Sequence, residues 1–371
     1  MRLKIGIDFH VLDGKFQGSR THVLELFSRL IAQSPDIDFY LFLDKPELLL
    51  TLSSTFSASN VHRIRMPQAN PLKRLYWQLP RLARKYELDI LHTQYILPWP
   101  LSCLGIVTIH DVLFETHPEY FEWIFVLRSR VLMRVAAKYA AHVFAVSEFS
   151  RSEIKRLYGI PESRISVALN GADFTRFIPG KEGEHLLKKR GLVSGGYILS
   201  VGRLEPRKNH RLLVEAYAML DKEALPLVLI GQPDFQFDDV FTTITRLNLW
   251  GRVHVFEDVS DIELPVLYRH ACLFVYPAFA EGFGMPPLEA MASGVPVIVS
   301  NTTAIPEVVG DAGVLISPYE VAPLAAAMKQ LLADPLERIR LSCVGHERAL
   351  SFNWDAPARQ VRERYLAAMG R

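Results

Sequence analysis

Short apolar segments alternate with amphipathic segments along the whole chain. In the first half the apolar runs are "LKIGID", "DFYLFL", "DILHTQ", "GIVTIHD" and "HVFAVS". Helical periodicity follows them, as in "THVLELFSRLIAQ" and "SRVLMRVAAKYAA". Continuous apolar runs separated by helices are typical of a parallel sheet that is covered on both faces. We therefore predict an α/β fold.

A stretch rich in Gly, Pro and charge, "NGADFTRFIPGKEGEHLLKKRGLVSGG", interrupts this pattern. A second series of strands follows, including "YILSVG", "LPLVLIG", "RVHVFE", "LFVYPA" and "VPVIVS". We predict two doubly wound, Rossmann-like domains, residues 1–175 and 190–355, facing across a cleft. The last helix, about 356–371, is expected to pack back on the first domain. Ligands of such sheets bind beyond the carboxyl ends of the strands.

Composition narrows the function classes. Of 371 residues, 49% are hydrophobic and 22% are charged, and the net charge of +2 does not indicate a nucleic-acid partner. Cys103, Cys272 and Cys343 show no metal-binding spacing, so we expect reduced thiols and no metal site. The N-terminus lacks a signal-peptide pattern and no apolar run has the length of a spanning helix. We predict a cytoplasmic protein.

The segment "EGFGMPPLEAMASG" indicates a strand, a glycine loop and a helix N-terminus. Gly282 and Gly284 allow close approach of a ligand, and Pro287 suits the first helical turn. The free N–H groups and the dipole at such a terminus favour an anion such as a diphosphate. A Gly/Pro loop with solvated glutamates is the plainer alternative for this motif taken alone.

Glu281 and Glu289 have two interpretations. A glycosidase needs two carboxyl groups that flank one bond, typically from different strand ends. We favour the other interpretation, in which both carboxylates accept hydrogen bonds from hydroxyl groups beside a bound diphosphate. "SVGRLEPRKNH" supports it, because Arg203 and Lys208 follow a strand end and offer positive charge to a diphosphate leaving group. In isolation these two cations could equally form a solvated basic turn.

Together these segments resemble the retaining GT-B glycosyltransferases of family four, which include bacterial mannosyl- and glucosyltransferases. The resemblance is carried by "EGFGMPPLEAMASGVPVIVS" and "VGRLEPRKN", and extends through "TIHD", "AVSEFSRSEI", "ALNGADFTRF" and "NTTAIPEVVGDAG". It spans nearly the full length. It implies a nucleotide-diphosphate sugar as donor, no other cofactor and no metal.

The resemblance also implies roles for individual residues. Arg203 and Lys208 would hold the donor diphosphate, and Glu281 would bind hydroxyls of the donor sugar. Glu289 would bind the ribose. Backbone N–H groups around sugar and phosphate would come from three consecutive residues, Phe283, Gly284 and Met285.

In the first domain, His110 matches the family's histidine near the reacting sugar, although a lone histidine that ends a strand is more often structural. Gly18 matches the glycine loop after the first strand, but Arg20 stands near the usual position of a second glycine. Arg20 is equally compatible with phosphate binding and with a surface role. Glu257 replaces a usual glycine near the nucleotide base, which leaves the base open.

We expect transfer of a hexose, with retention, to a hydroxyl of a glycan or lipid-linked acceptor in cell-surface polysaccharide synthesis. GDP-mannose is the favoured donor, and a UDP-sugar such as UDP-glucose is the alternative. A non-catalytic nucleotide-sugar-binding protein is the alternative from another class. A glycoside phosphorylase is disfavoured because no pyridoxal-phosphate lysine is evident.

A basic stretch in the first domain, residues 63–85, mixes seven Lys and Arg residues with Tyr76, Trp77 and several leucines. Such a segment could rest on the inner face of a membrane as a peripheral contact. The competing interpretation, a helix that packs on its own sheet with a solvated basic face, is favoured, and Pro80 argues against one long helix.

Overall fold

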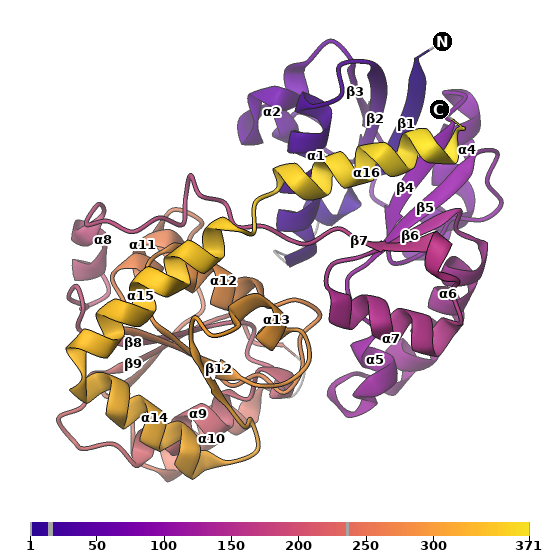
Figure 1. The fold of residues 1–371 in the computed structure, drawn as a ribbon. Coiled ribbons are helices and arrows are strands. Elements are labelled where there is room, and N and C mark those ends of the chain that lie inside the picture. Colours follow the sequence, from indigo (N-terminus) through magenta and orange to yellow (C-terminus); the bar gives the residue numbers. More distant parts are fainter. Residues whose placement is uncertain (1, 14–17, 235–236, 371) are drawn as a thin grey trace. The chain divides into compact units, whose positions relative to one another are not determined.

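The computed structural model describes residues 2–13, 18–234 and 237–370. The chain divides into two compact units (Figure 1). Unit 1 comprises residues 1–115, 123–170 and 353–371, and unit 2 comprises residues 116–122 and 171–352. The first unit therefore takes its last segment from the C-terminus, and the change of unit after Asn170 falls where the Gly- and Pro-rich stretch begins.

Unit 1 is built on a parallel sheet of seven strands in the order β3-β2-β1-β4-β5-β6-β7. The strands are β1 (Leu3–Asp8), β2 (Ile37–Leu43), β3 (Val61–Arg65), β4 (Ile90–Gln94), β5 (Leu104–Ile109), β6 (His142–Ala145) and β7 (Ile165–Val167). The helices are α1 (Gly18–Ala32), α2 (Leu48–Leu52), α3 (Pro71–Lys73), α4 (Leu79–Lys85), α5 (Leu113–Thr116), α6 (Trp123–Tyr139), α7 (Glu148–Tyr158) and α16 (Asp355–Ala368).

Unit 2 has a parallel sheet of six strands in the order β10-β9-β8-β11-β12-β13. The strands are β8 (Ile198–Val201), β9 (Leu227–Ile230), β10 (Val253–Phe256), β11 (Leu273–Tyr276), β12 (Val297–Ser300) and β13 (Val314–Ile316). The helices are α8 (Glu184–Lys188), α9 (His210–Ala218), α10 (Asp238–Arg246), α11 (Glu263–Arg269), α12 (Met285–Ala292), α13 (Ile305–Val309), α14 (Val321–Ala333) and α15 (Pro335–Leu350).

Both sheets have the doubly wound strand order, in which the winding direction reverses once. The reversal lies between β1 and β4 in unit 1 and between β8 and β11 in unit 2. The prediction of two doubly wound α/β domains is confirmed. The reversal points matter for function, because loops diverge there and leave room for a ligand beyond the carboxyl ends of the strands.

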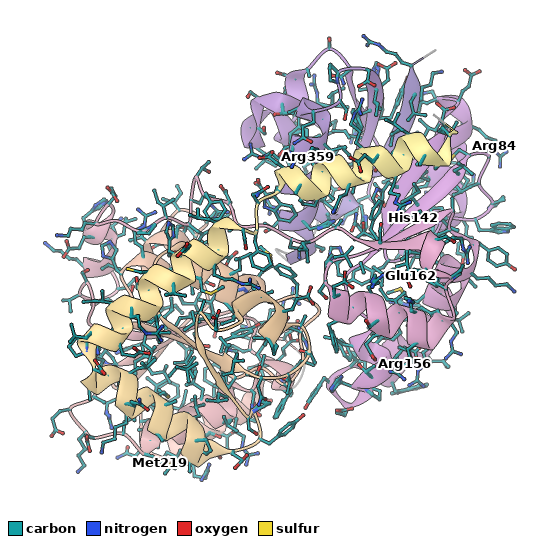
Figure 2. All side chains as sticks on the ribbon, in the orientation of Figure 1. Arg84, His142, Arg156, Glu162, Met219 and Arg359 are labelled. Carbon is teal, nitrogen blue, oxygen red and sulfur yellow. The ribbon has the colours of Figure 1, made fainter. Side chains whose placement is uncertain are left out.

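The cores follow from the apolar runs. Side chains of β1, β2, α1 and α16 form one buried cluster, and α9, α14 and the strands of unit 2 form another. Figure 2 draws the side chains on the ribbons of both units. The C-terminal helix α16 lies against α1, with Ala358, Val361 and Tyr365 buried in the unit 1 core. A second cluster in unit 1 joins Phe42 of β2 to Leu75 and Leu79.

The basic stretch 63–85 is not one amphipathic helix. Its first residues belong to the edge strand β3, which the sequence pattern did not predict, and the rest forms α3, a π-helical segment (Arg74–Gln78) and α4. Arg74 turns inward and forms an ion pair with the fully buried Asp8 at the end of β1. Arg63 donates from Nη1 to the Phe56 carbonyl at 2.6 Å. Arg65 Nε lies 3.8 Å from Asp44 Oδ1, so three of the seven cations have polar partners within unit 1.

In the described part of the chain, no helix combines the length and the apolar character needed to cross a bilayer.

Candidate active site

Unit 2 gathers its charged side chains at the point where the sheet winding reverses. Lys208 follows β8 through a short 3-10 turn (Pro206–Lys208), and Glu281 follows β11. Because β8 and β11 are parallel neighbours, their carboxyl ends meet at the same edge. The structure therefore brings together two of the predicted residues that lie 73 positions apart in sequence.

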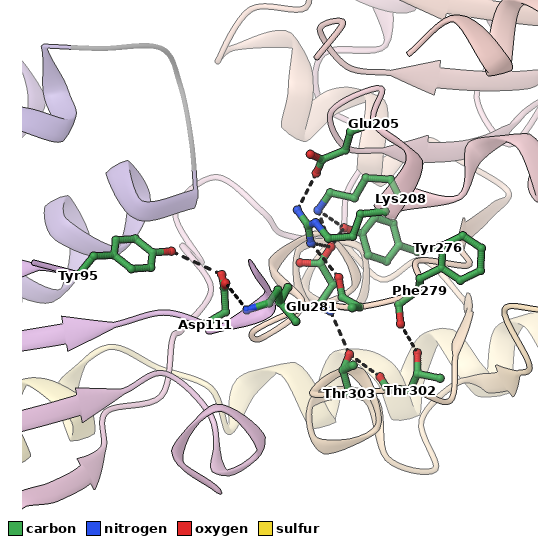
Figure 3. Close-up of polar contacts among 12 residues, drawn as sticks. Tyr95, Asp111, Glu205, Lys208, Tyr276, Phe279, Glu281, Thr302 and Thr303 are labelled. Carbon is green, nitrogen blue, oxygen red and sulfur yellow. Dashed lines mark hydrogen bonds and ion pairs between the residues drawn. The ribbon is translucent and has the colours of Figure 1, made fainter. Parts of the chain in front are cut away.

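A single oxygen of Glu281 holds the centre of this cluster (Figure 3). Its Oε1 accepts hydrogen bonds from Arg207 Nη1 at 2.9 Å and from the Tyr276 hydroxyl at 2.7 Å, and it also pairs with Lys208 Nζ. Lys208 Nζ in turn donates to the Tyr276 hydroxyl at 2.8 Å. All three of these contacts with Glu281 fall on Oε1.

The neighbouring charges fix the protonation state of Glu281. Burial by itself would raise the pKa of this carboxyl, but Arg207 and Lys208 outweigh burial and lower the pKa to about 2. The pKa of Lys208 is lowered by burial and by Arg207, and Glu281 opposes that shift. Near neutral pH Glu281 is an anion that accepts hydrogen bonds, which is the state needed to bind hydroxyl groups.

Two strained residues keep the surrounding loops in place. Thr303 has φ +56 and accepts the Glu281 backbone N–H on its Oγ1 at 2.9 Å. Asn209 has φ +57, and its Nδ2 donates to the Pro277 and Pro318 carbonyls at 3.1 and 2.8 Å. A left-handed backbone at a non-glycine residue costs about 1–3 kcal/mol and is found mostly at functional sites. Both residues flank the cluster around Glu281.

The glycine loop leads into α12 as predicted. Gly284 has φ +118 and lies at the N-cap of α12, where a side chain would be strained. Met285 is the first residue of the helix, and prolines occupy its first turn. The phenyl ring of Phe283 is buried and contacts Phe352 edge-on, with centroids 6.0 Å apart. Phe283 thus anchors the loop through its side chain.

Arg203 lies directly after β8 but does not join Glu281. Its Nη1 forms an ion pair with Asp234, and about a third of each side chain is exposed. The backbone segments that follow β8 and β9 approach each other closely here. A Cβ on Gly231 would lie 1.9 Å from the Gly202 carbonyl oxygen. This close approach keeps the end of β9 beside the backbone of Gly202 and Arg203.

Glu289 lies in the second turn of α12, half-buried beside the Tyr268 hydroxyl. Burial raises the pKa of this carboxyl to about 7, while Tyr268 and Arg176 act to lower it. Glu281 and Glu289 therefore differ in protonation behaviour. One is fixed as an anion and the other changes charge close to neutral pH.

His110 is placed in unit 1, directly after β5. Its Nε2 lies 2.7 Å from Gln94 Oε1, and its carbonyl accepts the Ser150 hydroxyl at 2.9 Å. The His22 ring packs edge-on, with centroids 4.7 Å apart. Burial, together with the nearby His22 and His92, holds the pKa of His110 well below its usual value. His110 is thus a neutral imidazole that donates from Nε2 to Gln94.

Gly18 is the first residue of α1, and a Cβ added there would contact nothing within 4 Å. The loop residues 14–17 before it lie outside the described residues. Ser147 acts as the N-cap of α7 and accepts the Ser150 N–H at 3.0 Å. Ser147 therefore has a structural role at the start of this helix.

The sequence analysis missed Arg207, Tyr276 and Gln94. Arg207 bridges Glu281 and Glu205, donating to the latter from Nη2 at 2.6 Å. A signal was available, since Arg207 adjoins Lys208 and Tyr276 ends the strand before the glycine loop. Gln94 ends β4, next to the strand that precedes His110, but nothing in its local sequence marks it.

Comparison with known proteins agrees with this geometry. Residues 16–176 match the family described as Glycosyltransferase Family 4, and residues 187–347 match the family described as Glycosyl transferases group 1. The chain is 38% identical over 289 residues to the O-antigen chain mannosyltransferase B of Escherichia coli, covering 76% of this chain and 74% of that one. It is 30% identical over 267 residues to the O-antigen chain mannosyltransferase RfbU of Salmonella typhimurium, covering 71% of each.

A solved structure shares the whole fold. The sucrose-phosphate synthase of Thermosynechococcus elongatus superposes with a TM-score of 0.80 at 23% identity, covering 100% of both chains. This chain belongs to the glycosyltransferases of family four, with the GT-B fold. The resemblance inferred from the glycine loop and the Arg203–Lys208 segment is confirmed at the level of the family.

Proposed function

We propose that this glycosyltransferase transfers mannose from GDP-mannose to a hydroxyl of a glycan or lipid-linked glycan during synthesis of a cell-surface polysaccharide, with retention of configuration. The choice of mannose is supported by the names of the two relatives described above, both O-antigen chain mannosyltransferases. The observation that carries the proposal is the Glu281 cluster, in which a fixed carboxylate lies between two cations at the reversal point of the unit 2 sheet.

In this proposal each charge has a separate task. Lys208 and Arg203 bind the diphosphate, together with backbone N–H groups of residues 283–285 and the N-terminus of α12. Glu281 Oε2 accepts hydroxyls of the mannose, while Oε1 stays occupied by Arg207, Lys208 and Tyr276. Glu289 accepts ribose hydroxyls, and Gly18, the first residue of α1, lies on the acceptor side.

Retention follows if the acceptor attacks from the face that the diphosphate leaves. The bond between C1 of mannose and the β-phosphate oxygen breaks, and a bond from C1 to the acceptor oxygen forms. The acceptor proton passes to the departing β-phosphate, so no carboxylate nucleophile is required. Charge growing on the leaving group is stabilised by Arg203, Lys208 and the helix end, which supports catalysis without a metal. In this proposal His110 contacts the reacting sugar as a neutral hydrogen-bonding group.

The test is a donor panel. Thermal unfolding of the protein is measured with GDP, UDP, GDP-mannose and UDP-glucose, and transfer is followed with each radiolabelled sugar nucleotide and a lipid-linked glycan acceptor, with and without a metal chelator. We expect GDP and GDP-mannose to stabilise, transfer to persist in chelator, and the product to be α-linked. Transfer from UDP-glucose alone would overturn the donor assignment, and β-linked product would overturn retention.

An inactive protein that still binds GDP-mannose would favour the non-catalytic alternative. A lipid-linked acceptor would also bring the enzyme to a membrane as a peripheral protein on its cytoplasmic face.

A further inference from the structure

The outer face of α6 carries an apolar stripe that nothing in unit 1 covers. Its exposed members recur at helical spacing along the whole helix: Trp123, Ile124, Leu127, Val131, Val135 and Tyr139. Trp123 is 74% exposed, and Leu127 and Val131 are 59% and 58% exposed. The opposite face, with Val126 and Met133, is buried. An exposed apolar face on a helix whose other face is already buried typically marks a binding surface for a partner or a membrane.

The charges on α6 all have the same sign. Its sequence, "WIFVLRSRVLMRVAAKY", contains four cations and no acidic residue. Arg130 and Arg134 pair with Glu115. Arg128 and Lys138 form no ion pair among the described residues, and each lies over an aromatic ring of its own helix, Phe125 at 5.8 Å and Tyr139 at 5.4 Å. The stripe therefore carries two positive charges that are not neutralised by the protein.

The aromatic residues concentrate at the two ends of the stripe. Trp123 begins α6, and Tyr139 ends it beside Trp99, with ring centroids 5.8 Å apart. Trp99 is itself more than half exposed. Tryptophan and tyrosine favour the boundary between lipid and water, since their rings are apolar and carry one polar group.

These features distinguish a lipid surface from a protein partner. Central positions of protein interfaces are depleted of charge and lysine, whereas cations beside an apolar stripe suit anionic headgroups. The helix is too short and too charged to span a bilayer, and no spanning helix occurs in the described part of the chain. Long cationic side chains beside the stripe can reach the headgroups while the stripe enters the acyl boundary.

We propose that the α6 stripe, with Trp99, docks this enzyme on an anionic lipid surface, α6 lying in the plane of the interface. The stripe differs from the basic stretch 63–85, whose cations Arg63 and Arg74 are engaged within unit 1. The proposal does not depend on the donor chemistry, since vesicle binding is measured without substrate. If the wild-type protein does not bind vesicles but transfers the sugar to a water-soluble acceptor, the docking proposal alone is overturned. If it binds vesicles but transfers no sugar, the proposed function alone is overturned.

The experiment is flotation of the full chain with vesicles of phosphatidylcholine, with or without phosphatidylglycerol. We expect binding only to vesicles containing phosphatidylglycerol, weakening with added salt. The double variant Leu127→Glu/Val131→Glu should lower the partition coefficient about a hundredfold, because two apolar side chains no longer enter the interface. Arg128→Gln/Lys138→Gln, which keeps the stripe, should lower it about thirtyfold, since each cation near such a surface contributes about fivefold.

Two matched variants complete the design. Leu336→Glu/Ile339→Glu changes two exposed apolar residues of α15 and adds the same charge as the first variant. Leu72→Glu/Trp77→Glu does so in the stretch 63–85. Both should float like the wild type, and all variants should keep the wild-type melting temperature. The proposal is overturned if the α6 variants float normally, if neutral vesicles bind equally well, or if the Leu72/Trp77 pair alone abolishes binding. Size-exclusion chromatography tests whether the stripe is instead a dimer interface. A wild-type dimer that does not float with vesicles and that Leu127→Glu/Val131→Glu converts to monomer would also overturn the proposal.

Discussion

The two units share a strand order but differ in the chemistry at the carboxyl ends of their strands. In unit 2, Arg207, Lys208 and Glu281 form a charged cluster with Tyr276. In unit 1, the neutral His110 lies against Gln94 and the ring of His22. The charged end suits a diphosphate, whose negative charge grows during transfer, and the neutral end suits hydroxyl groups. Under the proposed function, one scaffold serves two different ligands through its loop residues.

Unit 1 does hold charges at its reversal point, but they are paired. Asp8 is fully buried at the end of β1, and its pKa is lowered to about 2 because His10 and Arg74 outweigh the effect of burial. Strain marks both units, since Tyr95, 5.1 Å from the His110 ring, has φ +62, as Asn209 and Thr303 have positive φ in unit 2. The units therefore share a constrained backbone and paired charges. They differ in the cations that contact the buried carboxylate, since Arg207 and Lys208 both contact Glu281 in unit 2, whereas a single arginine, Arg74, pairs with Asp8 in unit 1.

The largest expected effect comes from removing a cation of unit 2. Lys208→Ala should lower kcat/KM by about a thousandfold, the scale of losing one preorganised electrostatic contact to a transition state. It should also abolish thermal stabilisation by the nucleotide diphosphate, because the diphosphate loses a cation that binds it. Initial rates of sugar transfer and melting temperatures with nucleotide measure the two effects.

The control for this variant is Lys329→Ala, which breaks an exposed ion pair with Asp221 in the same unit. Exposed pairs contribute little to stability, so this variant should behave as the wild type. If Lys208→Ala retains both turnover and nucleotide stabilisation, the diphosphate is bound elsewhere. The proposed role of the charged cluster of unit 2 is then wrong.

A change in unit 1 should separate transfer from nucleotide binding. His110→Ala should lower kcat about a hundredfold, because the reacting groups lose a positioned contact, while stabilisation by nucleotide stays unchanged. His62→Ala, on the edge strand β3, serves as the control and should retain full activity. Loss of nucleotide stabilisation in His110→Ala would mean that the neutral site also binds the nucleotide.

Sequence reasoning succeeded where the pattern is local. The continuous apolar runs predicted the central strands, and the Gly284 loop predicted the start of α12. It failed for β3 and β7, short edge strands of five and three residues, because "VHRIR" and "ISV" lack a long apolar run. Lys208 and Glu281 could be named from their motifs. Tyr276 could be located at the end of the strand before the glycine loop, but its bonds to both residues could not be predicted. Its role depends on the register of β8 and β11, which only the folded sheet defines.

Tyr276 offers a smaller and more selective test. Tyr276→Phe removes only the hydroxyl that donates to Glu281 and accepts from Lys208. Since one hydrogen bond contributes about 1 kcal/mol, we expect roughly a fivefold loss in kcat with little change in donor KM. Tyr217→Phe removes another buried hydroxyl of unit 2, bonded to the Leu225 carbonyl at 3.0 Å. Equal loss of turnover in the two variants would assign Tyr276 a structural role only.

Glu289 should give the smallest effect, one that depends on pH. Its pKa is raised to about 7 by burial, so the carboxyl is neutral below that pH and ionised above it. A carboxylate accepts ribose hydroxyls more strongly than a carboxylic acid does. Nucleotide affinity should therefore rise severalfold from pH 6 to pH 8, and binding at pH 7 should release a fraction of a proton. Calorimetry in two buffers with different ionisation enthalpies measures that proton.

In Glu289→Gln the carboxyl that titrates near pH 7 is absent, so nucleotide affinity should not vary with pH through this group, and no proton should be released. The fixed anion Glu281, with its pKa near 2, cannot produce a transition between pH 6 and 8. A pH dependence that persists unchanged in Glu289→Gln would assign it to another group and remove Glu289 from the nucleotide site. A dependence that disappears would place the two carboxylates of one short motif in different roles, the first as a permanent anion held by cations and the second as an acceptor that is charged when the ribose binds.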